Sequence, residues 1–179
     1  DSVFADKLKV TNEAFPRYVP SARVHTFHRF LPYEVFYDKN PEYYALRNGK
    51  RLPTQLCLTN TDVLKIVKDS VNSFFNKSPN SDVISVSQDD NTQYCQCDKC
   101  SKIDNQEGSP AGTMIHFVNA VAESFPNKTI STLAYQYTRK PPKVKPIENV
   151  LITLYSIDCN SSVPIELGSK DFSSDLKCW

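Results

Sequence analysis

The sequence predicts an α/β fold, built as a partial (β/α)8 TIM barrel of about four parallel strand–helix units. Segments of strand length rich in β-branched residues alternate with amphipathic helices along the 179 residues, and this alternation is typical of parallel βαβ units. A closed barrel needs about twice as many strands, and the chain begins and ends within apparent helices. We therefore expect residues 1–179 to form one domain, roughly half of a barrel whose remaining half lies elsewhere in a larger protein.

The first predicted unit covers the N-terminal part of the chain. Val24–Leu31 is rich in β-branched and aromatic residues and predicts the first strand. A long loop with the turn-forming pair Asn48–Gly49 follows, and Thr61–Asn76 predicts a helix that Asn60 or Thr61 caps. Its apolar stripe has the spacing of one helix face and comprises Val63, Ile66, Val67, Val71, Phe74 and Phe75.

The later units follow the same order, but their crossovers are less regular. The proline-rich segment Arg139–Pro146 cannot form a regular helix, so the crossover there is degenerate. Asp171–Trp179 has the pattern of the first turns of a further helix. The other predicted elements are a strand at Val83–Ser87, a helix at Ala111–Ser124, and strands at Thr129–Gln136 and Val150–Ile157.

A small doubly wound α/β domain is the alternative fold. Such a domain carries a glycine-rich turn after its first strand. The chain has only 4 glycines and none of them forms such a turn, so the partial barrel is favoured.

The charge balance excludes several classes of partner. The formal net charge is +1, with 23% charged residues, which gives no reason to expect binding to nucleic acid or to an anionic membrane. The longest apolar runs, such as Val150–Leu154, have the length of a strand, so we expect no membrane-spanning segment.

Polar residues follow the second predicted strand directly, at Gln88, Asp89, Asp90 and Asn91. Parallel α/β folds bind their ligands at the carboxyl ends of the strands. Because strand side chains alternate, Asp89 should point the same way as Ser85, into the barrel mouth, whereas Asp90 lies where the strand turns. Two carboxylates beside two amides favour polar recognition over a place in the core.

The two aspartates also have a simpler interpretation, in which one caps a turn or pairs with an arginine. Glycoside hydrolysis needs two carboxyl groups, about 5 Å apart for retention or about 6.5–9.5 Å apart for inversion. Neighbours in sequence at a strand end usually diverge, so Asp89 or Asp90 would act with a carboxylate from another strand. Asp158, after the fourth predicted strand, is the candidate within this chain; the remaining half of the barrel is the other source.

The ends of other predicted strands are polar and aromatic as well. Each such residue alone has an ordinary explanation, because histidines are often satisfied inside a core and tyrosines can close the top of a barrel. Together, they combine groups that bind hydroxyls with rings on which a sugar can stack, and they predict a carbohydrate substrate. The candidate substrate-binding residues are His25, His28, Arg29, Gln88, Asn91, Tyr135, Gln136, Tyr137 and Arg139.

The motif Cys95-x-Cys97-x-x-Cys100 is the most specific local pattern. Three thiolates at this spacing can surround one metal, and tetrahedral zinc needs a fourth ligand. Cys57 is the first choice for that ligand and Cys159 the second. A zinc ion held by four thiolates has no open position, so we expect a structural and not a catalytic cofactor. Disulfides, such as Cys95–Cys100 or Cys57–Cys97, and free thiols are the alternatives.

Several blocks of the sequence are similar to a known family. They are HTFHRFLP, QLCLTN, SVSQDDN, the CxCxxC motif, EGSPAGTMIHFVNAVA and TLAYQYTRKPP. On these blocks the chain, from about Val24 to Trp179, resembles the bacterial family called domain of unknown function 4838. The central region of that family is similar to the catalytic barrels of glycoside hydrolases, the β-hexosaminidases and α-glucuronidases. The resemblance implies a (β/α) barrel, polysaccharide degradation, and a periplasmic, cell-surface or secreted bacterial protein.

The resemblance also bears on the carboxylates. Asn fills the place of Asp89 in the matching family block, which favours Asp90, whereas strand alternation favours Asp89; both remain candidates. Asp158 stands where the family often has Glu, so a carboxylate is preserved. β-Hexosaminidases carry an Asp-Glu pair at one strand end, and this chain has none there. The resemblance therefore does not imply their substrate-assisted mechanism.

Three functional hypotheses follow. The first is a glycoside hydrolase acting on a polysaccharide or glycan, with Asp90 or Asp89 as acid/base or substrate-orienting group and Asp158 as the second carboxyl. The second is a non-catalytic carbohydrate-binding barrel. The third is a zinc-bound interaction module, which predicts that the polar strand ends do not come together.

Overall fold

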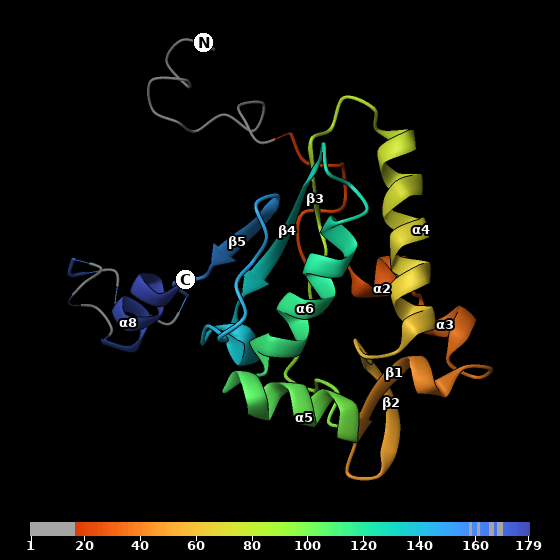
Figure 1. Cartoon of the computed structure of the whole chain (residues 1–179), viewed down its shortest axis with the longest axis horizontal. Helices are drawn as coiled ribbons and strands as arrows, with labels where there is room; N and C mark the ends of the chain where they lie inside the picture. Colours follow the sequence, from red (N-terminus) through yellow and green to blue (C-terminus); the bar gives the residue numbers. More distant parts are fainter. Residues whose placement is uncertain (1–16, 158, 161, 165–166, 168–169) are drawn as a thin grey trace.

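The computed structural model describes residues 17–157, 159–160, 162–164, 167 and 170–179. The fold is mixed α/β, and its centre is a three-stranded parallel sheet in the order β3-β4-β5 (Figure 1). These strands are Val83–Ser85, Thr129–Ala134 and Val150–Leu154. The predicted strands at these three places are confirmed. The described residues form no closed barrel.

The predicted first strand, Val24–Leu31, is wrong. Its second half forms the one-turn helix α2, Phe27–Phe30. The backbone turns away from a strand conformation because Ser21 and His25 both have left-handed φ angles, of 60° and 52°, which few residues other than glycine adopt. The β-branched and aromatic composition of this segment favours a strand and does not indicate a single helical turn.

A segment earlier in the chain occupies the place beside β3. Tyr18 forms an isolated parallel bridge with Val83, and the backbone N–H of Val19 donates to the carbonyl of Val83 at 2.7 Å. Further along, the N–H of Ser85 donates to the carbonyl of Ala22 at 2.9 Å. The sheet therefore has an irregular fourth neighbour and not the fourth regular strand that the sequence predicted.

The long loop after α2 contains ordered structure. After the short helices α3 (Tyr33–Phe36) and η1 (Pro41–Tyr43), strands β1 (Tyr44–Arg47) and β2 (Lys50–Leu56) form an antiparallel hairpin. Asn48 and Gly49 at its tip have φ angles of 49° and 75°, which is the backbone of a two-residue type I′ turn. The Asn-Gly pair predicted the turn, and the structure adds the two strands.

Helix α4, Thr61–Lys77, agrees with the prediction. The side chain of Asn60 caps it by accepting hydrogen bonds from the backbone N–H groups of Asp62 (2.8 Å) and Val63 (3.2 Å). The predicted stripe faces the core, where Val63, Val67, Val71 and Phe75 are buried.

Helix α6, Ala111–Ala122, is also confirmed, and it packs against β4 and β5 with α4 beside it (Figure 1). Helix α5, Asp98–Glu107, was not predicted. It lacks an apolar stripe, and its one buried residue is Cys100. Gly112 allows the two helices to approach closely, because a Cβ there would lie 2.4 Å from the Cβ of Glu107.

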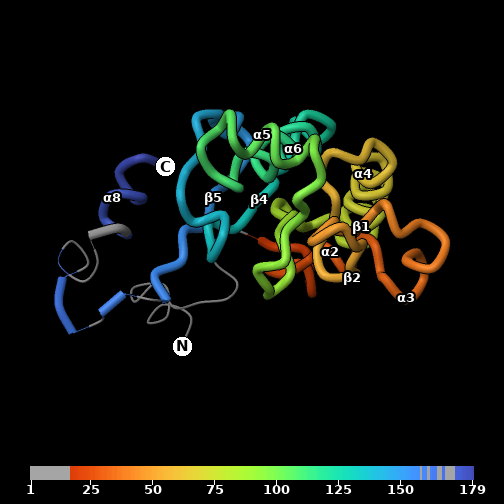
Figure 2. Tube along the Cα trace, turned by 90° about the horizontal axis from the view of Figure 1, so that it is seen from below, coloured from red at the N-terminus to blue at the C-terminus, as the bar shows by residue number. Residues whose placement is uncertain are grey.

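The crossover after β4 contains no regular helix over residues 139–146, as its prolines predicted. Helix α8, Lys170–Cys178, confirms the helix expected at the C-terminal end. Figure 2 shows α8 beyond β5, at the opposite end of the molecule from the β1–β2 hairpin. No helix in the described part of the chain is long and apolar enough to cross a membrane.

The hydrophobic core lies between the sheet, α2, α4 and α6. Ile84 and Val86 point into it, while Ser85 and Ser87 lie on the other side of the strand, buried and hydrogen-bonded to each other at 2.9 Å. The alternation predicted for this strand is therefore present. The strand leads from the core to the polar residues that follow it, Gln88–Asn91.

Candidate functional site

The ends of β3 and β4 meet at Asp90. Its Oδ1 accepts hydrogen bonds from the Tyr135 hydroxyl at 3.2 Å and from Gln136 Nε2 at 3.3 Å, and these two donors are themselves 3.1 Å apart. Asp90 is exposed, and within the described part of the chain no hydrogen bond reaches its Oδ2. The tyrosine ring also contacts the ring of Tyr155, which follows β5, at 5.5 Å. Side chains that follow all three strands therefore meet at the carboxyl end of the sheet.

Asp89 points to a different partner. Its Oδ1 lies 2.7 Å from Nδ1 of His28, on α2, and accepts a longer bond of 3.4 Å from the backbone N–H of the same histidine. The side chain of Asp89 is 20% exposed and that of His28 is 49% exposed. The two aspartates thus diverge, as expected for neighbours at a strand end.

Gln55, on β2, holds the backbone of the aspartate loop, and sequence reasoning missed it. Its side chain is buried; Nε2 donates to the carbonyls of Asp89 (2.7 Å) and Asn91 (3.0 Å), and Oε1 accepts from the N–H of Asp89 (3.1 Å). The Asn91 amide in turn donates to the carbonyl of Thr54 at 3.0 Å. Asn91 is therefore a structural contact between the loop and the hairpin. No signal in the sequence singles it out, because its strand was not predicted and its burial depends on the tertiary structure.

His25 lies between α2 and the two strand ends. Its backbone N–H donates to Ser87 Oγ at 3.0 Å, and its Nδ1 lies 2.8 Å from the carbonyl oxygen of Gln88. Its ring is tilted against the ring of Tyr135, with centroids 6.2 Å apart. The left-handed backbone of this residue, with φ of 52°, is held by these contacts and directs the ring toward the strand ends.

Gln88 is fully buried beneath this surface. Its Nε2 donates to Thr138 Oγ1 at 2.7 Å and to the carbonyl of Tyr135 at 3.2 Å. Its Oε1 is buried without a hydrogen bond in the described residues. Gln88 therefore joins the ends of β3 and β4 from below, and it does not reach the surface on which Asp90 lies.

Two other candidate residues have partners away from this surface. Tyr137 stacks on Tyr94, with ring centroids 4.7 Å apart and an interplanar angle of 21°, and the guanidinium group of Arg47 lies over the Tyr94 ring at 5.2 Å. Arg139 forms an ion pair with Asp175 on α8, with a distance of 2.9 Å from Nε to Oδ2. Both side chains are thus engaged by other parts of the fold.

The remaining candidates are Arg29 and Asp158. Arg29 is exposed on α2. Asp158, the predicted second carboxyl, lies outside the residues that the structure describes.

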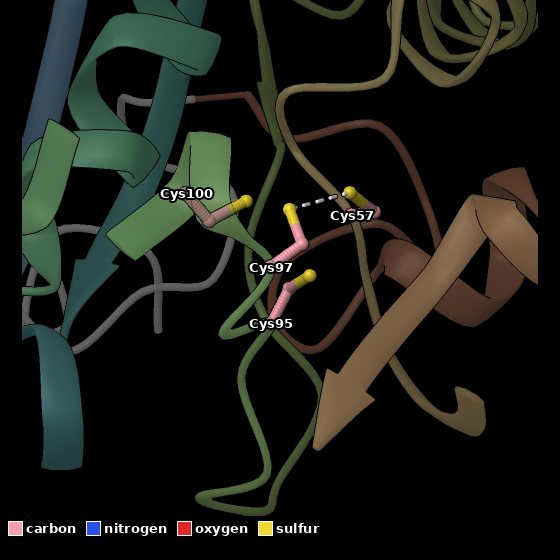
Figure 3. Close-up of side chains that lie close together, drawn as sticks. All are labelled: Cys57, Cys95, Cys97 and Cys100. Carbon is pink, nitrogen blue, oxygen red and sulfur yellow. Dashed lines mark hydrogen bonds between the residues drawn. The ribbon is translucent and has the colours of Figure 1, made fainter. Parts of the chain in front are cut away.

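Four cysteines form a compact cluster beside the loop (Figure 3). The Sγ atoms of Cys57, Cys95, Cys97 and Cys100 all lie within 4.8 Å of one another. Cys57 follows β2, Cys95 lies in the loop, Cys97 directly precedes α5, and Cys100 lies in the first turn of that helix. The predicted set of four, including Cys57 as the fourth member, is the set that the fold brings together.

The cysteines are free thiols in the structure. Cys57 and Cys97, one of the pairs considered for a disulfide, have sulfur atoms 3.7 Å apart, whereas a disulfide bond is about 2.05 Å long. Cys159, the second choice for a ligand, does not belong to the cluster.

The thiols of the cluster shift one another's pKa values. Hydrogen bonds with Cys100 and then Cys95 lower the pKa of Cys57, while the hydrogen bond to Cys57 is the first cause that raises the pKa of Cys100. Four thiolates at this spacing would repel one another strongly unless a metal neutralised them.

The surroundings of the cluster suit a metal site. Thr59 Oγ1 lies 3.3 Å from Cys100 Sγ and 3.7 Å from Cys97 Sγ, and the backbone N–H of Leu46 donates to Cys95 Sγ at 3.3 Å. Such second contacts orient metal ligands. A cleft of about 360 Å³, lined by Cys57 and Cys97 among others, gives an ion a path to the cluster.

The comparisons with known proteins place the chain in one family. A family model described as "Domain of unknown function (DUF4838)" matches residues 4–179, which confirms the resemblance found in the sequence. No curated protein and no solved structure matches the chain.

Proposed function

The chain belongs to the family described as domain of unknown function 4838, and on that premise we propose that it forms part of a glycoside-hydrolase-type (β/α) barrel. Its carboxyl-end surface, made by Asp90, Tyr135, Gln136, His25 and the Asp89–His28 pair, binds a glycan. Asp90 is the acid/base or substrate-orienting carboxylate. The second carboxyl comes from Asp158 or from the remaining half of the barrel.

The observation that carries this proposal is the contact of Asp90 with the end of the neighbouring strand. Two neutral donors, Tyr135 and Gln136, hold one oxygen of an exposed carboxylate, and the other oxygen remains available for a ligand. Neutral donors orient a carboxylate without the charge of an arginine.

The exposure of β5, at the lateral edge of the sheet, supports the proposal of a larger barrel. Both faces of β5 are only partly covered, and Leu151 within it and Tyr155 directly after it are exposed, whereas strands of parallel sheets are normally covered on both faces. An open edge of this kind is also available for pairing with another strand. We propose that the remaining half of the barrel continues the sheet beyond β5.

We also propose that the cysteine cluster binds zinc in a structural role. Zinc–sulfur bonds of about 2.3 Å in a tetrahedron place the sulfurs about 3.8 Å apart, close to the 3.7 Å between Cys57 and Cys97. Four thiolates complete the coordination, so no catalytic role is assigned to the metal. The ion would hold β2 against the loop that carries Asp89 and Asp90.

A non-catalytic glycan-binding barrel is the second candidate, and one observation favours it. Asp89 is engaged by His28 at 2.7 Å, so Asp90 is the one aspartate of the adjacent pair that remains for chemistry. If no second carboxyl lies at hydrolytic distance, the surface binds a glycan without cleaving it.

Both candidates are tested on the protein in its full length. Wild type and Asp90→Asn are assayed on aryl glycosides and uronide oligosaccharides and applied to a glycan array, with Asp38→Asn, an exposed aspartate that makes none of these contacts, as control. A hydrolase loses about a hundredfold or more of its activity in Asp90→Asn and keeps it in Asp38→Asn. Binding without turnover by the wild type favours the second candidate, and neither binding nor turnover contradicts both.

A further inference from the structure

For two histidines at the candidate surface, the hydrogen-bond partners determine which ring nitrogen carries the hydrogen. Nδ1 of His25 lies 2.8 Å from the carbonyl oxygen of Gln88, and Nδ1 of His28 lies 2.7 Å from the carboxylate of Asp89. Both partners are acceptors, so each Nδ1 carries the hydrogen and donates it. In a neutral imidazole the other nitrogen is then an acceptor. Both rings therefore present Nε2 with a lone pair.

The two rings belong to the surface that contains Asp90. His25 packs against Tyr135, whose hydroxyl donates to Asp90, and His28 pairs with Asp89, the residue before Asp90. His28 is half-exposed, so a ligand can reach its ring. The surface thus combines one available carboxylate with two fixed acceptor nitrogens.

We propose that His25 and His28 accept hydrogen bonds at Nε2 from hydroxyl groups of the glycan, and that Asp89 is a positioning residue that acts through His28. This inference rests on the proposed function and narrows its ligand to one with several hydroxyl donors. It also separates the roles of the two aspartates, because Asp90 meets the ligand and Asp89 orients a group that does.

The chain contains a matched pair that does not face this surface. Nε2 of His116 lies 3.0 Å from the carboxylate of Glu107, and the exposed fractions of the two side chains, 49% and 16%, nearly equal those of His28 and Asp89. In this pair the opposite nitrogen is engaged. His116 therefore controls for the general effect of a surface histidine–carboxylate contact.

The first test measures the histidine tautomers by ¹⁵N–¹H NMR on the neutral rings. We expect Nδ1–H for His28 and Nε2–H for His116 in the wild type. In Asp89→Ala, where Gln55 still holds the backbone of residue 89, His28 should lose its preference for Nδ1–H and His116 should not change. An Nε2–H tautomer for His28 in the wild type, or no change in the variant, overturns the role of Asp89.

The second test measures binding of chito-oligosaccharides and glucuronic-acid-bearing xylo-oligosaccharides by calorimetry. We expect His28→Ala and His25→Asn each to weaken binding about tenfold, the loss of one hydrogen bond, and His116→Ala to bind as the wild type does. Asn is chosen at position 25 because it tolerates the left-handed backbone.

The double variant separates positioning from direct contact. Since Asp89 acts through His28, Asp89→Ala combined with His28→Ala should bind no more weakly than His28→Ala alone. Additive losses would mean that Asp89 contacts the ligand itself, and unchanged binding in both histidine variants overturns the inference while the proposed function stands. If the wild type binds neither probe nor any glycan on the array, both the inference and the proposed function are wrong.

Discussion

Gln55 and Asp89 hydrogen-bond in both directions: Gln55 Nε2 donates to the carbonyl of Asp89 at 2.7 Å, and Gln55 Oε1 accepts from its N–H at 3.1 Å. Gln55 stands two residues before Cys57, a member of the cysteine cluster. One strand, β2, thus links the cluster to the aspartate loop. The geometry of the candidate surface depends on a residue that never reaches it.

Replacing Gln55 with Ala should loosen the aspartate loop. Three hydrogen bonds to buried or half-buried backbone groups disappear, and we expect the free energy of unfolding to fall by about 2–4 kcal/mol. Chemical denaturation measures this change. Gln93→Ala, in the same loop and exposed, should stay within about 0.5 kcal/mol of the wild type; an equal loss in both variants would contradict the role of Gln55.

Replacing Cys57 with Ser should abolish stoichiometric metal. The purified wild type is expected to contain one zinc per chain by elemental analysis, and the variant much less, because one of four ligands is lost. Metal that binds only the folded chain adds about 3 kcal/mol of stability at about a hundred times its Kd, so the variant and the chelated wild type should melt at a lower temperature.

The control for the metal experiment is Cys178→Ser, an exposed cysteine outside the cluster. It should keep both the zinc and the melting temperature of the wild type. Absence of metal in the wild type, together with fewer than four titratable thiols, would exclude the zinc site.

Replacing Arg139 with Ala should weaken the attachment of α8 without affecting glycan binding, because it removes the ion pair with Asp175 and keeps the backbone carbonyl. Arg139 donates to Asp175 at 2.9 Å in a half-buried ion pair, and its carbonyl accepts from Trp179 Nε1 at 2.7 Å. We expect a loss of about 1–3 kcal/mol and faster hydrogen exchange in α8. Asp175→Ala should behave alike, and weaker glycan binding in Arg139→Ala alone would restore Arg139 to the substrate-binding set.

Replacing Asp104 with Asn should stabilise the protein at neutral pH. Burial raises the pKa of this carboxyl, and the hydrogen bonds from the Thr113 hydroxyl and backbone N–H lower it only in part. A raised folded-state pKa means that the ionised form opposes folding above that pKa, and that this cost vanishes as the pH falls below the unfolded-state pKa. The Asn oxygen can accept the same two hydrogen bonds.

The expected pH profile distinguishes this effect from a general one. The gain in melting temperature of Asp104→Asn should be largest near pH 7 and should disappear in acid, near the ordinary pKa of aspartate. Asp69→Asn, an exposed residue on α4, should show no such profile. A gain that does not change with pH would contradict burial as the cause.

The regular elements could be predicted because their own residues carry the pattern. Helix α4 has an apolar stripe and a side-chain cap at Asn60, and β4 is rich in β-branched residues, with five of its six residues buried. Helix α5 has no such pattern, since its buried contact is a cysteine that packs on other cysteines. The strand expected at Val24–Leu31 was wrong because two left-handed residues, Ser21 and His25, redirect the backbone.

The sequence by itself determined the family, the helices α4 and α6, and the three parallel strands, because spacing and periodicity act over short distances along the chain. The cysteine set could also be predicted, because three of its four members lie within the six residues Cys95–Cys100. Only the tertiary structure decided the partners of the aspartates: His28 for Asp89, and Tyr135 and Gln136 for Asp90. It also decided that Gln55 holds their loop. These contacts join residues 34 to 61 positions apart, and only packing of the sheet, the hairpin and α2 brings such residues together.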